Sequence, residues 1–128
     1  MKALKKIALA AMVAASLGAV SSTAFAETDA GRIVYSPTTA IEMTAGKVQV
    51  ALDALIAGSD AETVSKLIKE ASDATKEINA SDSVFRASTK ANNMIKAARN
   101  HVKEGANQQA EQELRNAHQA VLDLKKIL

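Results

Sequence analysis

The chain has 128 residues, of which 48% are hydrophobic, 23% are charged and only 2% are aromatic. This composition is ordinary for a soluble globular protein and excludes wholesale disorder. One proline and five glycines leave little turn chemistry for a β-sandwich or barrel, so the composition favours an all-α fold. The absence of cysteine from the sequence excludes a disulfide scaffold, a thiol nucleophile and a cysteine zinc site.

The first 26 residues have the pattern of a secretory signal peptide. Three lysines in the first six residues precede an apolar run over residues 7–20, which is too short to cross a bilayer core of ~30 Å as a helix. Residues 24–26 read Ala-Phe-Ala, the small-x-small pattern of a cleavage site. We expect cleavage after Ala26, export to the periplasm, and no membrane association after cleavage.

Cleavage changes the charge of the chain. The full sequence has 16 basic and 14 acidic residues, a net charge of +2. Removing three lysines leaves 13 against 14, a net charge of −1, on the 102 residues that remain of the 128. Nucleic-acid binding calls for a basic stripe in the sequence and usually for aromatic platforms. The mature sequence shows neither, so we expect no nucleic-acid partner.

After an N-terminal arm at 27–36, four amphipathic helices are predicted. Ser36 and Pro37 begin the first helix as N-cap and first helical residue, and Gly58 ends it. The expected core positions of this helix recur at alternating steps of four and three residues: Ile41, Ala45, Val48, Leu52 and Leu55. The same helix carries a second, weaker apolar strip, which is either a partner or dimer surface or merely a set of tolerated surface alanines: Met43, Val50, Ala54 and Ala57.

The other three helices follow the same rules. Ser59 and Glu62 predict a capping box for the second, Ser81 or Asp82 caps the third, and Asn107 caps the fourth. The predicted stripes are Val64, Leu67, Ala71, Ala74 and Ile78; Val84, Ser88, Ala91, Ile95, Ala98 and Val102; and Ala110, Leu114, Ala117, Val121, Leu124 and Leu128. Most of these residues are small, and the large anchors expected in the core are Leu52, Leu55, Ile68, Phe85, Ile95, Leu114 and Leu124.

The two halves of the chain resemble each other as helical hairpins. Residues 51–58 align with 98–105 at an offset of 47, with a glycine ending each segment, and residues 67–78 align with 113–124. A hairpin with one apolar face cannot bury that face alone. We therefore predict an antiparallel, up-down-up-down four-helix bundle over 37–128, built from two similar hairpins.

His101 and His118 are the only imidazoles. Counted from the hinge at Gly105, their levels differ by nine residues, or ~13 Å at 1.5 Å per residue, which is too far for one ion to bind both within a monomer. His101 and Glu104 are i, i+3 neighbours and can face the same ion, whereas Arg115 disfavours a metal at His118. The candidate metal ligands are His101, Glu104 and His118. No catalytic set can be assembled, and we expect a binding protein and not an enzyme.

The hinge sequences resemble those of a known family. Ala98, His101 and Gly105 form Ala-x-x-His-x-x-x-Gly before the hinge, and Ala117, Ala120 and Leu124 follow it. This pattern on an exported, cysteine-free hairpin repeat is similar to the small metal-binding protein family of bacterial periplasms. The resemblance implies a four-helix bundle that binds divalent metals such as copper. Only His101 carries over by position; the residues where further histidines would recur are Ala54, Asn116 and Asp123.

Three functions therefore remain open from the sequence. The first is weak binding or buffering of a divalent metal (copper, nickel or zinc) in the periplasm, at His101 and Glu104 or at a site completed by a second chain in a homodimer. The second is a periplasmic interaction or stress-associated helical protein that binds an unknown protein without metal. The third is a carrier of haem or another small ligand.

Overall fold

The computed structural model describes residues 33–128, and Tyr35–Leu128 form one compact unit. The predicted signal peptide and its cleavage site at Ala26 lie outside the described residues, as does most of the predicted arm; residues 33–36 of that arm have no regular secondary structure. No helix in the described part of the chain is both long enough and apolar enough to cross a bilayer.

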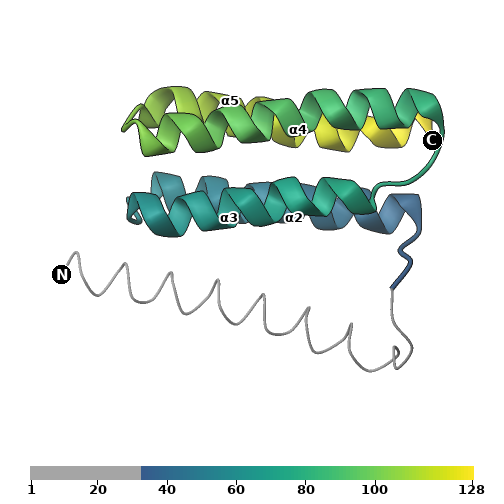
Figure 1. Cartoon of the computed structure of the whole chain (residues 1–128), viewed down its shortest axis with the longest axis horizontal. Coiled ribbons are helices and arrows are strands. Elements are labelled where there is room, and N and C mark those ends of the chain that lie inside the picture. The colour runs from purple at the N-terminus through teal and green to yellow at the C-terminus, as the bar shows by residue number, and fades with distance from the viewer. Residues whose placement is uncertain (1–32) are drawn as a thin grey trace. The chain divides into compact units, whose positions relative to one another are not determined.

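The unit consists of four α-helices packed together as a four-helix bundle (Figure 1). They are α2 (Pro37–Ile56), α3 (Ala61–Ala74), α4 (Asp82–Lys103) and α5 (Asn107–Asp123), with short 3₁₀ helices η1 (Thr75–Glu77) and η2 (Leu124–Ile127). Each helix packs against two others: α2 contacts α3 and α5, and α4 contacts the same two helices. This confirms the predicted all-α bundle; the up-down order of the helices remains the prediction made from their short connections.

Helix starts follow the local sequence, with two corrections. The side chains of Ser36 and Ser81 cap α2 and α4 as predicted, and Pro37 is the first residue of α2. The capping box predicted at Ser59 is wrong: the N-cap of α3 is Asp60, whose carboxylate accepts hydrogen bonds from the backbone and the hydroxyl of Thr63. Asn107 is likewise not a cap, because it is already helical and the preceding Ala106 has no side chain to cap α5.

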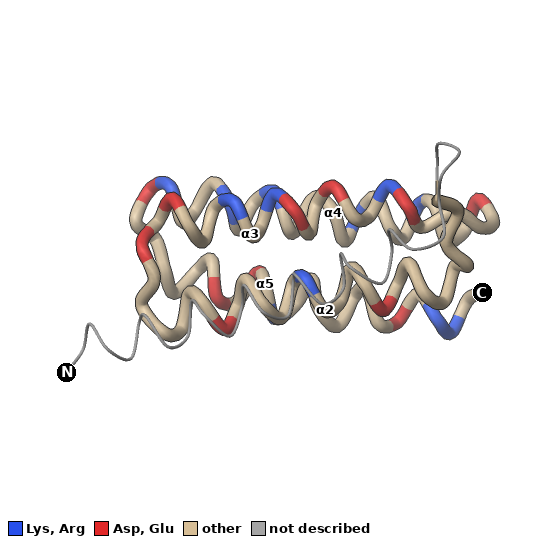
Figure 2. Tube along the Cα trace, turned by 90° about the horizontal axis from the view of Figure 1, so that it is seen from below, with Lys and Arg blue, Asp and Glu red and all other residues tan. Residues whose placement is uncertain are grey.

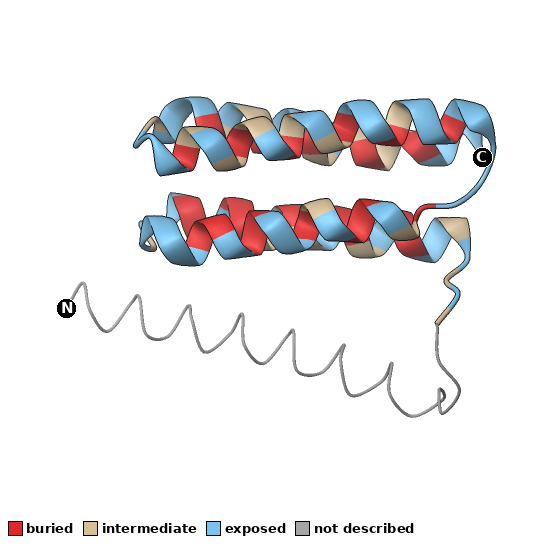
Figure 3. Cartoon of the chain, viewed as in Figure 1, coloured by how far each residue is buried: buried red, intermediate tan, exposed pale blue. Residues whose placement is uncertain are grey.

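The core consists of the predicted stripes. Every stripe residue is buried except Leu128, which is 53% exposed beyond the end of η2 (Figure 3). The prediction that Phe85 is a core anchor is also wrong, because its side chain is 68% exposed. Phe85 follows the stripe residue Val84 directly, and a residue one step along a helix faces about 100° away. The other large anchors are all buried: Leu52, Leu55, Ile68, Ile95, Leu114 and Leu124.

The second apolar strip on α2 is not one continuous surface. Ala54 is buried in the core at 2% exposure, and Met43 and Val50 are half-buried. Only Ala57, at the end of the helix, is exposed. The prediction of a partner surface formed by these four residues is therefore wrong, because α2 packs against both α3 and α5 and uses a wider part of its circumference than one stripe.

Candidate metal-ligating residues

His101 lies in the last turn of α4, where the end of the helix is held by backbone hydrogen bonds. The amide of Ala106 donates to the carbonyl of His101 at 2.8 Å, and the amide of Gly105 donates to the carbonyl of Val102 at 3.1 Å. These are the two bonds of a Schellman motif, which uses a glycine with positive φ; Gly105 has a φ of 79°. Gly105 therefore allows the hydrogen bonds that hold the backbone of His101 in the last turn of α4.

The imidazole of His101 faces a carboxylate on the neighbouring helix. Its Nδ1 lies 3.8 Å from Oε1 of Glu113 on α5, and the two side chains are 28% and 30% exposed. The separation is too long for a hydrogen bond. The Nδ1 atom is buried and has no hydrogen-bond partner in the described part of the molecule.

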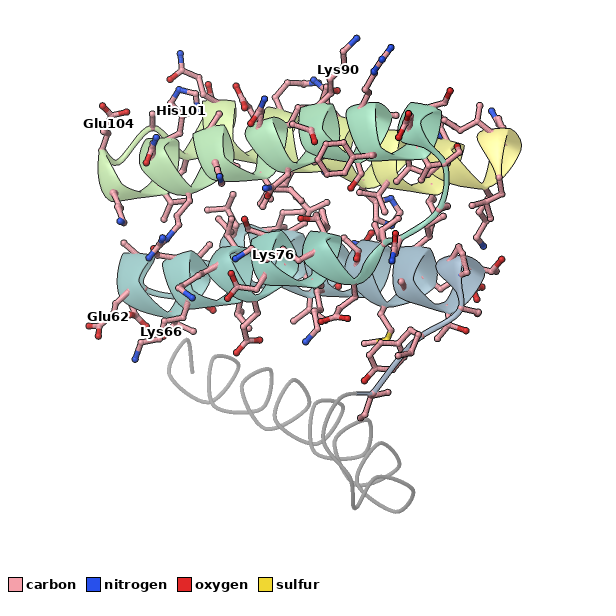
Figure 4. The ribbon with its side chains drawn as sticks, turned by 45° about the vertical axis from the view of Figure 1, so that its right-hand side comes forward. Glu62, Lys66, Lys76, Lys90, His101 and Glu104 are labelled. Carbon is pink, nitrogen blue, oxygen red and sulfur yellow. The ribbon has the colours of Figure 1, made fainter. Side chains whose placement is uncertain are left out.

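Glu104 and His118 are placed differently. Glu104 is the C-cap of α4 and is exposed at the same end of the bundle as His101 (Figure 4). His118 is half-buried on α5, and Arg115, three residues before it, forms an ion pair with Glu111 at 2.9 Å. Within residues 33–128, no three His, Cys, Asp or Glu side chains come together as a group that could hold a metal ion.

Glu113 is the residue that the sequence reasoning missed. It lies eight residues after Gly105 and His101 lies four before it, a mismatch of four residues or ~6 Å along the helices. Long side chains can span that offset, so the same counting that separates His101 from His118 admits a contact with Glu113. The bundle therefore places a second carboxylate near His101, across α4 and α5, besides the Glu104 predicted within α4.

A pair of this kind can do two things. Protonated His101 would form an ion pair with Glu113 near the C-terminus of α4, where a positive charge also favours the helix dipole. Neutral His101 would offer a nitrogen lone pair beside a carboxylate, which are two of the common ligands of zinc and copper. Comparison with protein families, curated proteins and solved structures found no match to this chain.

Proposed function

We propose that this chain is a small exported helical-bundle protein that binds a divalent metal weakly in the periplasm and does not act as an enzyme. The observation that carries the proposal is the unpartnered Nδ1 of His101, which lies 3.8 Å from the Glu113 carboxylate. Bonds of ~2 Å from an ion to each donor span up to ~4 Å. One ion therefore fits between these two atoms with a small adjustment of the side chains.

Two donors make a weak site. The remaining positions around the ion would be filled by water or by donors from a second copy of the chain. Copper(II) is the ion expected to bind best, because nitrogen and oxygen sites favour it over nickel and zinc. We expect a dissociation constant on the order of 10 μM, which is about −7 kcal/mol.

Calorimetric titration of residues 27–128 with Cu(II), Ni(II) and Zn(II) tests the proposal. Saturable copper binding should be lost in His101→Ala and weakened in Glu113→Gln. The matched controls are Glu104→Gln, which removes a neighbouring exposed carboxylate, and His118→Ala, which removes the other imidazole. Copper binding that depends on Glu104 and not on Glu113 would place the site within α4. A light-scattering mass measured with and without copper tells whether a homodimer completes the site.

The second candidate is an interaction or stress-associated helical protein that binds another protein without metal. Its supporting observation is an exposed aromatic ring, since Phe85 on α4 is 68% exposed on a chain with very few aromatic residues. Exposed large side chains at the C-terminus add apolar surface: Ile127 and Leu128. No heat of binding for any of the three ions would favour this candidate over the first.

A further inference from the structure

A groove with a volume of about 330 Å³ runs between α3 and α4, away from the His101–Glu113 pair. Four cations line it: Lys69 and Lys76 from the α3–η1 side, and Lys96 and Arg99 from α4. Asp73 is the one carboxylate in the lining. The groove therefore concentrates a charge of +3 on a chain whose predicted mature form has a net charge of −1.

The cations come from two facing walls of the groove. On the α3–η1 side, the Lys69 and Lys76 ammonium groups lie 2.8 Å and 3.8 Å from the two carboxylate oxygens of Asp73. Lys96 and Arg99 line the opposite wall. Figure 2 shows basic residues on the traces of both α3 and α4. Cations on two facing walls suit a ligand with several negative charges better than a single small ion.

Arg99 is the best-positioned of the four. Its Nε–H donates to the hydroxyl oxygen of Ser65 on α3 at 3.0 Å, and this bond across the two helices is partly shielded from water. No carboxylate in the described part of the chain lies within 4.0 Å of its guanidinium or of the Lys96 ammonium. The bond to Ser65 orients the guanidinium, and a planar guanidinium suits the oxygens of a phosphate group.

Asp73 pairs with both lysines of the α3–η1 side and offsets one of the four positive charges. It accepts a hydrogen bond from Lys69 at 2.8 Å and lies 3.8 Å from the Lys76 ammonium. Its pKa lies below the ordinary value of 3.8, chiefly because of the hydrogen bond from Lys69; the charges of Lys69, Lys76 and Arg99 also lower it, while burial opposes them. Cations from both walls thus act on the same point.

Besides its charged residues, the lining contains Ser72, Asn100 and Ile68. Ser72 donates from its hydroxyl to Oδ1 of Asn92 on α4 at 2.6 Å, a hydrogen bond that joins α3 to α4 beside the groove, and Asn100 adds an amide to the lining. Ile68 is the one apolar side chain in the lining. A groove without apolar pockets does not suit a peptide that binds by hydrophobic anchors.

We propose that the groove between α3 and α4 binds a soluble ligand that carries two or more phosphate groups. The cations on both walls and the oriented guanidinium of Arg99 favour this class. The cations line a recess, so the ligand enters it as a free molecule. The site is independent of the metal proposal, because it shares no residue with the His101–Glu113 pair.

Sodium tripolyphosphate is the probe for the first experiment, a calorimetric titration of the purified, metal-free protein in low-salt buffer. We expect saturable binding that weakens as salt screens the cations. The variant Lys76→Gln/Lys96→Gln removes one lysine from each wall and should weaken binding by about tenfold or more. Absence of binding to the unaltered protein would overturn the proposal.

The chain offers a matched control in Lys66→Gln/Lys90→Gln. Lys66 on α3 lies 3.7 Å from Glu62, much as Lys76 lies 3.8 Å from Asp73, and Lys90 on α4 has no carboxylate within 4.0 Å in residues 33–128, as is true of Lys96. Figure 4 shows Lys66 and Lys90 pointing away from the groove. This variant loses the same two charges and should bind within about twofold of the unaltered protein. Equal losses in both variants would mean attraction by net charge alone and would overturn the site.

Two further comparisons test the class of ligand. Citrate carries several carboxylates without phosphate geometry, and we expect it to bind markedly more weakly; equal affinity would overturn the phosphate assignment. Arg99→Lys keeps the charge but loses the planar guanidinium, and should weaken tripolyphosphate binding while the melting curve shows that the bundle still folds. His101→Ala should bind tripolyphosphate as the unaltered protein does, which separates this result from the metal titration.

Discussion

Gly58 and Gly105 occupy the same place in two copies of one helix-ending motif, 47 residues apart in the sequence. Their φ angles are 81° and 79°. The amide of Ser59 donates to the carbonyl of Ala54 at 3.0 Å, just as the amide of Ala106 donates to that of His101 at 2.8 Å. His101 is therefore the counterpart of Ala54, so the repeated hinge provides a half-exposed side chain in one hairpin and a buried methyl in the other.

Alanine substitutions at Gly58 and at Gly46 should change the free energy of unfolding in opposite directions. A Cβ added at Gly58 meets no other atom within 4 Å, so the cost of Gly58→Ala comes from the left-handed backbone, roughly 1–2 kcal/mol. Gly46 lies inside α2, and a Cβ there also meets nothing within 4 Å, so Gly46→Ala should stabilise by about 0.5–1 kcal/mol. Urea unfolding of both variants measures the two changes. A stabilised Gly58→Ala would contradict the account of the hinge.

Asp60 gives a pH-dependent prediction. Hydrogen bonds from the hydroxyl and then the backbone amide of Thr63 hold the pKa of this carboxyl below its ordinary value of 3.8, against a smaller opposing effect of burial. A depressed pKa means that the cap stabilises the fold above about pH 4 and that this contribution is lost as the pH falls through the folded pKa. Asp60→Asn keeps a good cap, so its melting temperature should fall less than that of the unaltered protein between pH 5 and pH 2. Ser59→Ala should behave like the unaltered protein at every pH.

Two substitutions in α4, at Ile95 and at Phe85, should differ strongly in their effect on the free energy of unfolding. Ile95 is completely buried, and Ile95→Ala should cost about 2–5 kcal/mol through lost burial and the cavity left behind. Phe85 is larger but 68% exposed, and Phe85→Ser should change the free energy of unfolding by less than about 0.5 kcal/mol. Chemical denaturation checks both values. A large loss in Phe85→Ser would mean that the ring is covered in solution by a second copy of the chain.

Much of the fold was predictable because helix periodicity is a strong local signal. The steps of three and four residues that identify Val84, Ala91 and Ile95 as core positions depend only on 3.6 residues per turn. Burial outside the stripe was not predictable in this way. Phe85 is apolar but faces away from the core, and Ala54 lies outside the α2 stripe yet is buried, because its exposure depends on how wide a face the neighbouring helices cover.

The candidate sites were harder to predict, because they depend on contacts between helices. His101 was found from its residue type, but its nearest carboxylate, Glu113, lies on the next helix and not at the i, i+3 position. The groove depends on Lys76 and Arg99, which are 23 residues apart in sequence and come together only when α3 packs against α4. Caps were missed for a simpler reason, since Ser59 and Asp60 are both good N-caps and adjacent.

Imidazole NMR during a Zn(II) titration tests the proposed metal site at His101 and Glu113. Zinc is diamagnetic, so the ring nitrogens of His101 and His118 can be followed separately in one sample of residues 27–128. We expect a saturable shift at Nδ1 of His101 that is weakened in Glu113→Gln, with His118 unchanged. Unchanged resonances for His101, or a shift confined to His118, would show that no metal binds between His101 and Glu113.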